Sequence, residues 1–140
     1  MIAELKEPLR QGRYNTSLAL TGNTGTDQKT IQIGIDDFWA SEILITGKDA
    51  DGDDILENVT SDVFKINITN EQGEGYTKEP IPLRALKGLV NSPRFKGWVF
   101  RSQTKLTIEA STDVFPSSTV NTYPVRIYIN FLGYRLKKGM

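Results

Sequence analysis

The chain has 140 residues, of which 38% are hydrophobic and 24% charged, a composition typical of one soluble domain with a single core. Its 17 basic residues equal its 17 acidic ones, so we expect no nucleic-acid partner, because duplex binding depends on neutralising phosphates. Neither Cys nor His occurs. Disulfides, thiolate chemistry and His-based sites are therefore excluded, and we expect no enzyme, cofactor or metal.

The opening of the chain predicts an N-terminal arm. Residues 1–13 mix charged side chains with Pro8 and show no strand or helix period. The arm is either a free terminus or a segment that docks on a neighbour, with Arg10 and Arg13 as candidate contact residues. The start lacks the apolar core of a signal peptide, and no apolar run approaches the roughly 18 residues of a membrane helix. These features predict a protein made in a cytoplasm, without a membrane partner.

Residues 14–140 are expected to form one β-sandwich domain, because apolar side chains alternate with polar ones in several short runs. The predicted strands cover residues 14–20, 30–35, 42–46, 63–69, 76–82, 98–101, 104–110 and 125–136. The clearest is 125–136, where Val125, Ile127, Ile129 and Phe131 share one face. Gly133 within it predicts a β-bulge or a close backbone approach.

Other segments carry more local expectations. Ile35 should point inward at the end of the second strand, and the Phe38-Trp39 pair is expected to plug the core rather than to form an exposed ligand platform. Pro80 and Pro82 favour an extended edge over 76–82, and residues 84–90 predict one helical turn or a short helix. The polar stretch 111–124 is expected to be a connector.

Two segments carry opposite charge. Residues 48–61 are acidic, with Asp51, Asp53 and Asp54 as candidate contacts. The Asp49-Ala-Asp-Gly-Asp pattern fails the calcium-loop spacing, because its glycine comes fourth rather than sixth, so we expect a solvated loop.

Residues 78–105 are basic, and their candidate contact residues are Arg94, Lys96 and Arg101. The two charged segments either pair within one molecule, are solvated, or join neighbouring copies. We predict that charge reversal in the basic segment weakens assembly if the last alternative holds.

About eight short strands and no long helix predict an all-β, two-sheet antiparallel sandwich of the jelly-roll type. An immunoglobulin-like sandwich is the alternative, of a fibronectin-like kind since the Cys pair is missing.

The order of motifs over residues 28–136 resembles small β-sandwich structural proteins of tailed-phage virions. The motifs that carry the resemblance are Asp36-Asp-Phe, Val63-Phe-Lys-Ile-Asn-Ile-Thr-Asn, Glu79-Pro-Ile-Pro-Leu, Arg101-Ser-Gln-Thr-Lys-Leu-Thr-Ile-Glu-Ala and the closing Pro124-Val-Arg-Ile-Tyr-Ile-Asn-Phe-Leu-Gly-Tyr-Arg-Leu.

The resemblance implies a non-enzymatic virion protein, made in the host cytoplasm, that decorates or cements a capsid. Its partners would be further copies of the chain and the major capsid or other virion proteins. A vertex or tail-attached subunit is a second possibility.

Two functions of other classes remain open. A carbohydrate-binding module would stack sugars on Trp39, Trp98, Tyr123 or Tyr128. An enzyme with two carboxylates among Asp36, Asp37 and Glu42 is the third hypothesis, although their spacing singles out no pair.

Overall fold

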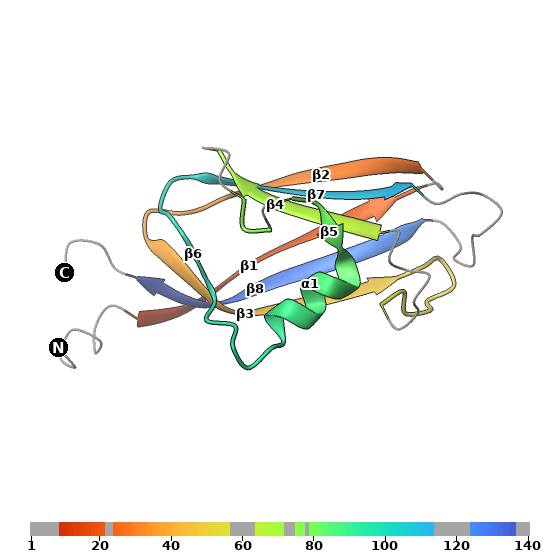
Figure 1. The fold of residues 1–140 in the computed structure, drawn as a ribbon. Coiled ribbons are helices and arrows are strands. Elements are labelled where there is room, and N and C mark those ends of the chain that lie inside the picture. Colours follow the sequence, from red (N-terminus) through yellow and green to blue (C-terminus); the bar gives the residue numbers. More distant parts are fainter. Residues whose placement is uncertain are drawn as a thin grey trace.

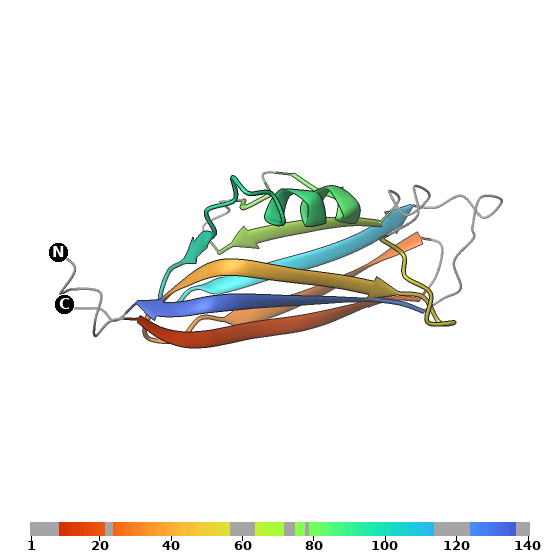
Figure 2. The same ribbon diagram turned by 90° about the horizontal axis from the view of Figure 1, so that it is seen from below.

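A computed structural model describes residues 9–21, 24–56, 64–71, 75–77, 79–113 and 124–136. These residues form two antiparallel four-stranded sheets and one short helix (Figures 1 and 2). In chain order the elements are β1 (Leu9–Leu20), β2 (Thr24–Gln32), β3 (Asp37–Lys48), β4 (Phe64–Asn70), β5 (Ile81–Pro82), α1 (Leu83–Val90), β6 (Trp98–Phe100), β7 (Lys105–Asp113) and β8 (Val125–Leu136).

The strand order confirms the predicted jelly roll. One sheet has the order β1-β8-β3-β6 and the other β2-β7-β4-β5. Four of the pairings join the first strand to the last, the second to the seventh, the third to the sixth and the fourth to the fifth. This is the pattern obtained when one long hairpin is rolled into two stacked sheets, and it defines a jelly roll.

The core lies between the sheets and comes from the alternation seen in the sequence. The predicted inward residues of β4, β7 and β8 are all buried. Phe38, Phe100 and Phe131 enter from the first sheet and Phe64 from the second, all nearly inaccessible to solvent. Phe100 and Phe131 meet edge to face with ring centroids 5.1 Å apart, the geometry that aromatic quadrupoles favour.

The helix α1 covers one side of the sandwich, where β5 has two residues and β6 three. Leu83, Leu86 and Val90 of α1 are buried because their spacing puts them on one helical face. The predicted helix over 84–90 is thus confirmed. The predicted edge over 76–82 is not one continuous strand. The Tyr76 N–H donates to the Ile68 carbonyl oxygen of β4, and among the described residues only Ile81 and Pro82 pair with β4 as a strand.

The predicted arm over residues 1–13 is wrong for its last five residues. β1 begins at Leu9 and pairs with β8 in continuous register, from Leu9 opposite Leu136 to Leu20 opposite Val125. Residues 9–13 lack an alternating apolar pattern, and their strand conformation comes from this long-range pairing. The domain therefore begins before residue 14, and residues 1–8 lie outside the described part.

The second strand was also predicted out of place. β2 spans Thr24–Gln32, and Ile35, which was expected inside, is 75% exposed. The chain turns at Gly34, whose N–H donates to the Tyr14 hydroxyl at 3.0 Å and whose carbonyl accepts from the Gln103 N–H. Ile31 and Ile33 are buried as predicted.

Two more strands, β3 and β7, are longer than predicted. β3 begins at Asp37 rather than residue 42, so Phe38 and Trp39 belong to the strand and point to opposite faces. Phe38 lies in the core as expected, whereas Trp39 lies on the outside, half-buried. β7 extends through Asp113, which takes residues 111–113 from the predicted connector, and residues 114–123 lie outside the described part.

Candidate functional site

The two sheets differ in what they present to solvent. The outward positions of β2, β4 and β7 in the second sheet are all polar: Thr26, Gln28, Thr30, Gln32, Lys65, Asn67, Thr69, Lys105, Thr107, Glu109 and Ser111. This is the ordinary pattern of an antiparallel sheet with one solvated face.

The outer face of the first sheet departs from that pattern. Six apolar or aromatic side chains lie on it: Trp39, Leu44, Val99, Tyr128, Leu132 and Tyr134. Leu44, Val99 and Tyr128 are 43%, 49% and 40% exposed, respectively. None of the described elements packs over this face (Figure 2). Leu44 and Tyr128 are diagonal neighbours on β3 and β8, and exposed apolar side chains that gather in this way mark binding surfaces more often than scattered ones do.

The outer face is interrupted by a β-bulge in β3. The register between β3 and β8 shifts between Ala40 and Glu42, which leaves Ser41 as the extra residue. The neighbouring position on β8 is Gly133, where a Cβ would overlap the Trp39 carbonyl. The close backbone approach predicted from Gly133 is therefore confirmed, and the bulge itself lies in the adjacent strand.

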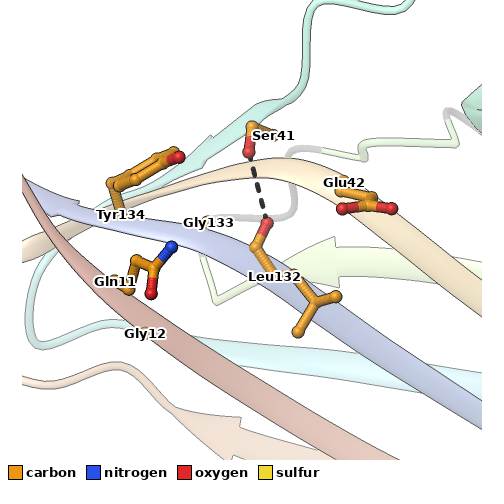
Figure 3. A pocket seen from close by; sticks show the side chains of 7 residues that line it. All are labelled: Gln11, Gly12, Ser41, Glu42, Leu132, Gly133 and Tyr134. Atoms are coloured by element: carbon orange, nitrogen blue, oxygen red, sulfur yellow. Dashed lines mark hydrogen bonds between the residues drawn. The ribbon is translucent and has the colours of Figure 1, made fainter.

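The bulge creates a hollow on the outer face. It has a volume of about 260 Å³ and is lined by Gln11, Gly12, Ser41, Glu42, Leu132, Gly133 and Tyr134 (Figure 3). We call it the bulge hollow. The extra residue increases the spacing between Trp39 and Glu42 along β3, so the side chains there stand further apart than in a regular strand. Ser41 Oγ lies 3.5 Å from the Leu132 carbonyl oxygen, a long and weak hydrogen bond.

The aromatic side of the hollow is held in place by a neighbouring loop. Trp39 packs beside Tyr134 with ring centroids 5.8 Å apart, and its Nε1–H donates to the Lys96 carbonyl oxygen at 3.0 Å. Gly97 follows in left-handed backbone conformation, with φ of 87°. A Cβ there would come within 2.6 Å of the Ala40 carbonyl oxygen, so this loop can lie against β3 only with glycine at that position.

The predicted basic contacts lie near this end of the sheet. Arg94, Lys96 and Arg101 are all exposed, and we call them the basic rim. Arg101 follows Phe100, which pairs with Phe38 at the start of β3. Arg13 is exposed on β1 opposite Leu132. The Arg10 backbone also lies in β1, opposite Arg135.

The predicted acidic contacts lie at the other end of β3. Asp51, Asp53 and Asp54 are exposed in the acidic loop, residues 49–54, directly after Lys48. About ten residues of strand separate this loop from the basic rim, which is roughly 30 Å. The acidic loop and the basic rim therefore lie at opposite ends of the sheet rather than side by side.

The acidic loop is organised around one buried carboxylate. Asp49 is 8% exposed, and its Oδ1 accepts hydrogen bonds from the N–H groups of Asp51 and Asp53 at 3.0 and 2.9 Å. Carboxylate oxygens of the three residues lie within 4.8 Å of one another. The hydrogen bonds explain the conformation of the loop without a cation, since they shape it as an Asx turn does.

The three carboxylates considered for catalysis do not meet. Asp37 Oδ1 accepts from the Ser102 N–H at 2.8 Å, which joins the start of β3 to the turn after β6. Glu42 lines the bulge hollow, whereas Asp36 lines a separate surface hollow with Tyr14 and Arg135.

The aromatic residues considered for sugar stacking are also dispersed. Trp98 is half-buried, packed between Tyr76 and Phe95 with centroid distances of 5.3 and 5.7 Å. Tyr128 is exposed and lines a second hollow, of about 360 Å³, with Asn15, Thr16, Ser17 and Asn130. Tyr123 lies outside the described residues. Only Trp39 lies beside the bulge hollow.

Sequence reasoning missed Gln11, Ser41, Leu44 and Tyr134. One signal was available. The buried positions of β3 change from even numbers at Phe38 and Ala40 to odd numbers at Ile43 and Ile45. Such a change of parity indicates one extra residue in the strand, which is a bulge.

The chain is thus an eight-stranded jelly-roll domain whose first sheet carries an exposed, partly apolar face with a hollow at a bulge. No protein-family model, curated protein or solved structure matches the chain. Within the described residues, no helix has both the length and the apolarity needed to span a membrane.

Proposed function

We propose that the chain is a non-enzymatic structural protein of a virion, which decorates or cements a capsid through repeated protein–protein contacts. The observation that carries the proposal is the difference between the two outer faces. One is uniformly polar, and the other exposes apolar side chains on a rigid sheet. Exposed apolar side chains on one face are a surface through which a domain can dock on a shell, whereas the polar face is the ordinary solvated kind.

The docking surface that we propose lies on the outer face of the first sheet, towards the acidic loop. We call it the distal patch. It is formed by Leu44 and Tyr128, with the polar side chains of Asn15, Ser17 and Asn130 beside them. Leu44 pairs with Asn130, and Tyr128 pairs with both Ser17 and Thr46, so the patch spans three neighbouring strands. Apolar anchors within a polar rim are the usual composition of a protein–protein interface.

The separated charges favour contacts between copies. Because the acidic loop and the basic rim lie at opposite ends of the sheet, the acidic end of one molecule can meet the basic end of the next. Such a head-to-tail contact repeats around a shell, and electrostatic complementarity sets its register. Each contact can be weak, since many copies on one particle together supply avidity.

The jelly-roll fold and the lack of histidine in the sequence are both compatible with this proposal. Jelly rolls occur in viral capsid proteins, lectins and cupins, so the fold alone does not decide among them. Without histidine in the sequence, the commonest protein metal ligand and general base are missing. A structural role needs neither.

The decisive experiment is to locate the protein in particles. Antiserum against the purified chain is used to probe fractions of a density gradient loaded with virus-sized particles from a culture that produces the chain. We expect the antigen to sediment with the particles, in many copies for a decoration protein or in few for a vertex or tail subunit. Antigen confined to the soluble fractions at the top of the gradient would overturn the proposal.

Leu44→Asp tests the distal patch. Leu44 is exposed, so the variant should fold, but a buried carboxylate in the interface should abolish incorporation of a tagged copy into particles. Thr107→Asp, at the centre of the polar outer face of the second sheet, is the matched control and should be incorporated normally. Equal incorporation of both variants would exclude the distal patch as the docking surface.

A further inference from the structure

We propose that the bulge hollow binds one neutral pyranose ring of a glycan. This inference does not depend on the virion assignment, because it concerns a different part of the outer face. Tyr134 in the hollow and Tyr128 in the distal patch are six residues apart along β8, which is about 20 Å. A protein docked through the distal patch can therefore leave the hollow open.

The first support is a combination of apolar and polar walls. Tyr134 and Leu132 provide apolar surface, and Trp39 lies against Tyr134. The C–H face of a pyranose packs on such aromatic and aliphatic groups, while its hydroxyls point to the side. Figure 3 shows Gln11, Ser41 and Glu42 distributed around the hollow, where they can meet those hydroxyls.

The second support is that these polar groups are available for hydrogen bonds to a ligand. Within the described part of the chain, the side chains of Gln11 and Glu42 have no hydrogen-bond partner, and both are exposed. The Ser41 hydroxyl makes only the 3.5 Å contact to the Leu132 carbonyl oxygen. A ligand can therefore bind them without first breaking strong hydrogen bonds within the protein.

The third support is the match of donors and acceptors. Glu42 only accepts hydrogen bonds, Gln11 both donates and accepts, and the Ser41 hydroxyl does both. Sugar hydroxyls also do both, so they can satisfy all three side chains. A lysine or arginine side chain of a protein partner only donates, which would leave the Gln11 amide N–H groups unused.

The size and charge of the bulge hollow narrow the class of ligand further. A volume of about 260 Å³ lies below the range of roughly 300–1,000 Å³ for drug-sized ligands, so the hollow suits a single ring. Among the described residues, Glu42 is the only charged side chain that lines it. Its carboxylate accepts charge-assisted hydrogen bonds from sugar hydroxyls, and because Arg13 flanks Leu132 on the other side, the two opposite charges favour a neutral sugar.

The experiment starts with the full chain on a glycan array, followed by titration with the free methyl glycoside of the class that binds. The sequence has two tryptophans, so Trp98→Phe leaves Trp39, beside the hollow, as the only indole reporter. We expect saturable binding that changes Trp39 fluorescence. Methyl glycosides of neutral hexoses should compete, and those of hexuronic acids should not.

Variants then locate the site. Tyr134→Ala and Glu42→Gln should each weaken binding at least tenfold, whereas Tyr134→Phe, which keeps the ring, should bind as the parent does. Tyr128→Ala removes an exposed aromatic outside the hollow and should leave binding unchanged. All variants are compared at equal folded fraction by circular dichroism.

Three results would overturn the proposal. The first is the absence of any sugar response at millimolar concentration, and the second is loss of binding in Tyr128→Ala rather than Tyr134→Ala. The third is a Trp39 response to methylguanidinium that exceeds the response to every sugar, which would identify a site for a basic side chain. None of these results bears on whether the protein sediments with particles, so the two proposals fail separately.

Discussion

The carbonyl oxygen of Trp39 occupies the space in which a side chain at Gly133 would begin. Gly133 lies in β8 opposite Gly12 on one side and Ala40 on the other. Three small residues in a row thus allow β3 to bulge toward β8, and the bulge forms the hollow. The candidate sugar site therefore depends on glycine at position 133, where the methyl group of an alanine would prevent the bulge.

Replacing Gly133 by alanine should destabilise the fold strongly. The new Cβ would overlap main-chain atoms of Trp39, which cannot move as a flexible side chain can. We expect a loss of about 3 kcal/mol in the free energy of unfolding, at the upper end of typical overpacking costs. Urea denaturation followed by circular dichroism measures it.

Gly88→Ala is the matched control. Gly88 lies within α1, with open space where its Cβ would be. Alanine there should raise the free energy of unfolding by about 0.5–1 kcal/mol, because it favours the helix and restricts the unfolded chain. Equal urea midpoints for the two variants would contradict the close approach at Gly133.

Thr77→Val should lower the free energy of unfolding, because it removes a buried hydroxyl that makes two hydrogen bonds. Thr77 Oγ1 accepts from the Ile68 N–H at 3.2 Å and donates to Asn67 Oδ1 at 2.7 Å. Valine keeps the shape but leaves the buried Ile68 N–H without this acceptor, at a cost of about 2 kcal/mol. Thr46→Val, on the exposed outer face, should change the free energy of unfolding little. Similar thermal midpoints for both would refute this role of Thr77.

Asp49→Ala should loosen the acidic loop. The variant removes the acceptor of two loop N–H groups, and we expect a loss of about 1–2 kcal/mol in the free energy of unfolding. Asp51→Ala should be nearly neutral, since that side chain is exposed. The thermal midpoint of the unmodified chain should be the same in EDTA and in millimolar calcium. A rise with calcium would show that the three carboxylates bind the ion.

Charge reversal in the basic rim tests the head-to-tail contact. Arg94→Glu, Lys96→Glu and Arg101→Glu together should weaken self-association by at least tenfold at low salt, with a smaller effect at high salt because of screening. Each rim reversal is also made alone, and Lys29→Glu, at an exposed position on β2, is the control for these single variants because it changes the net charge by the same amount. Sedimentation equilibrium gives the association constants, and unchanged association at low salt would rule out the electrostatic contact.

The sequence by itself determined most of the core and the class of fold. Alternation placed Ile66 and Ile68 in β4 and bounded β8 at Val125 and Leu136, because the two-residue period of a strand is a local property of the chain. Gly133 predicted a β-bulge or a close backbone approach, and the structure has the close approach at this residue. The turn-rich segments between such strands were enough to predict two stacked sheets.

Only the tertiary structure decided where strands extend and which residues meet. Leu9–Arg13 became a strand because β8 lies beside it, and Ile35 became exposed because the chain turns at Gly34. The bulge hollow joins side chains from β1, β3 and β8, which are far apart in sequence. Pairing partners and register are long-range properties, so local alternation indicated a sandwich but could not bring Gln11, Glu42 and Tyr134 to one site.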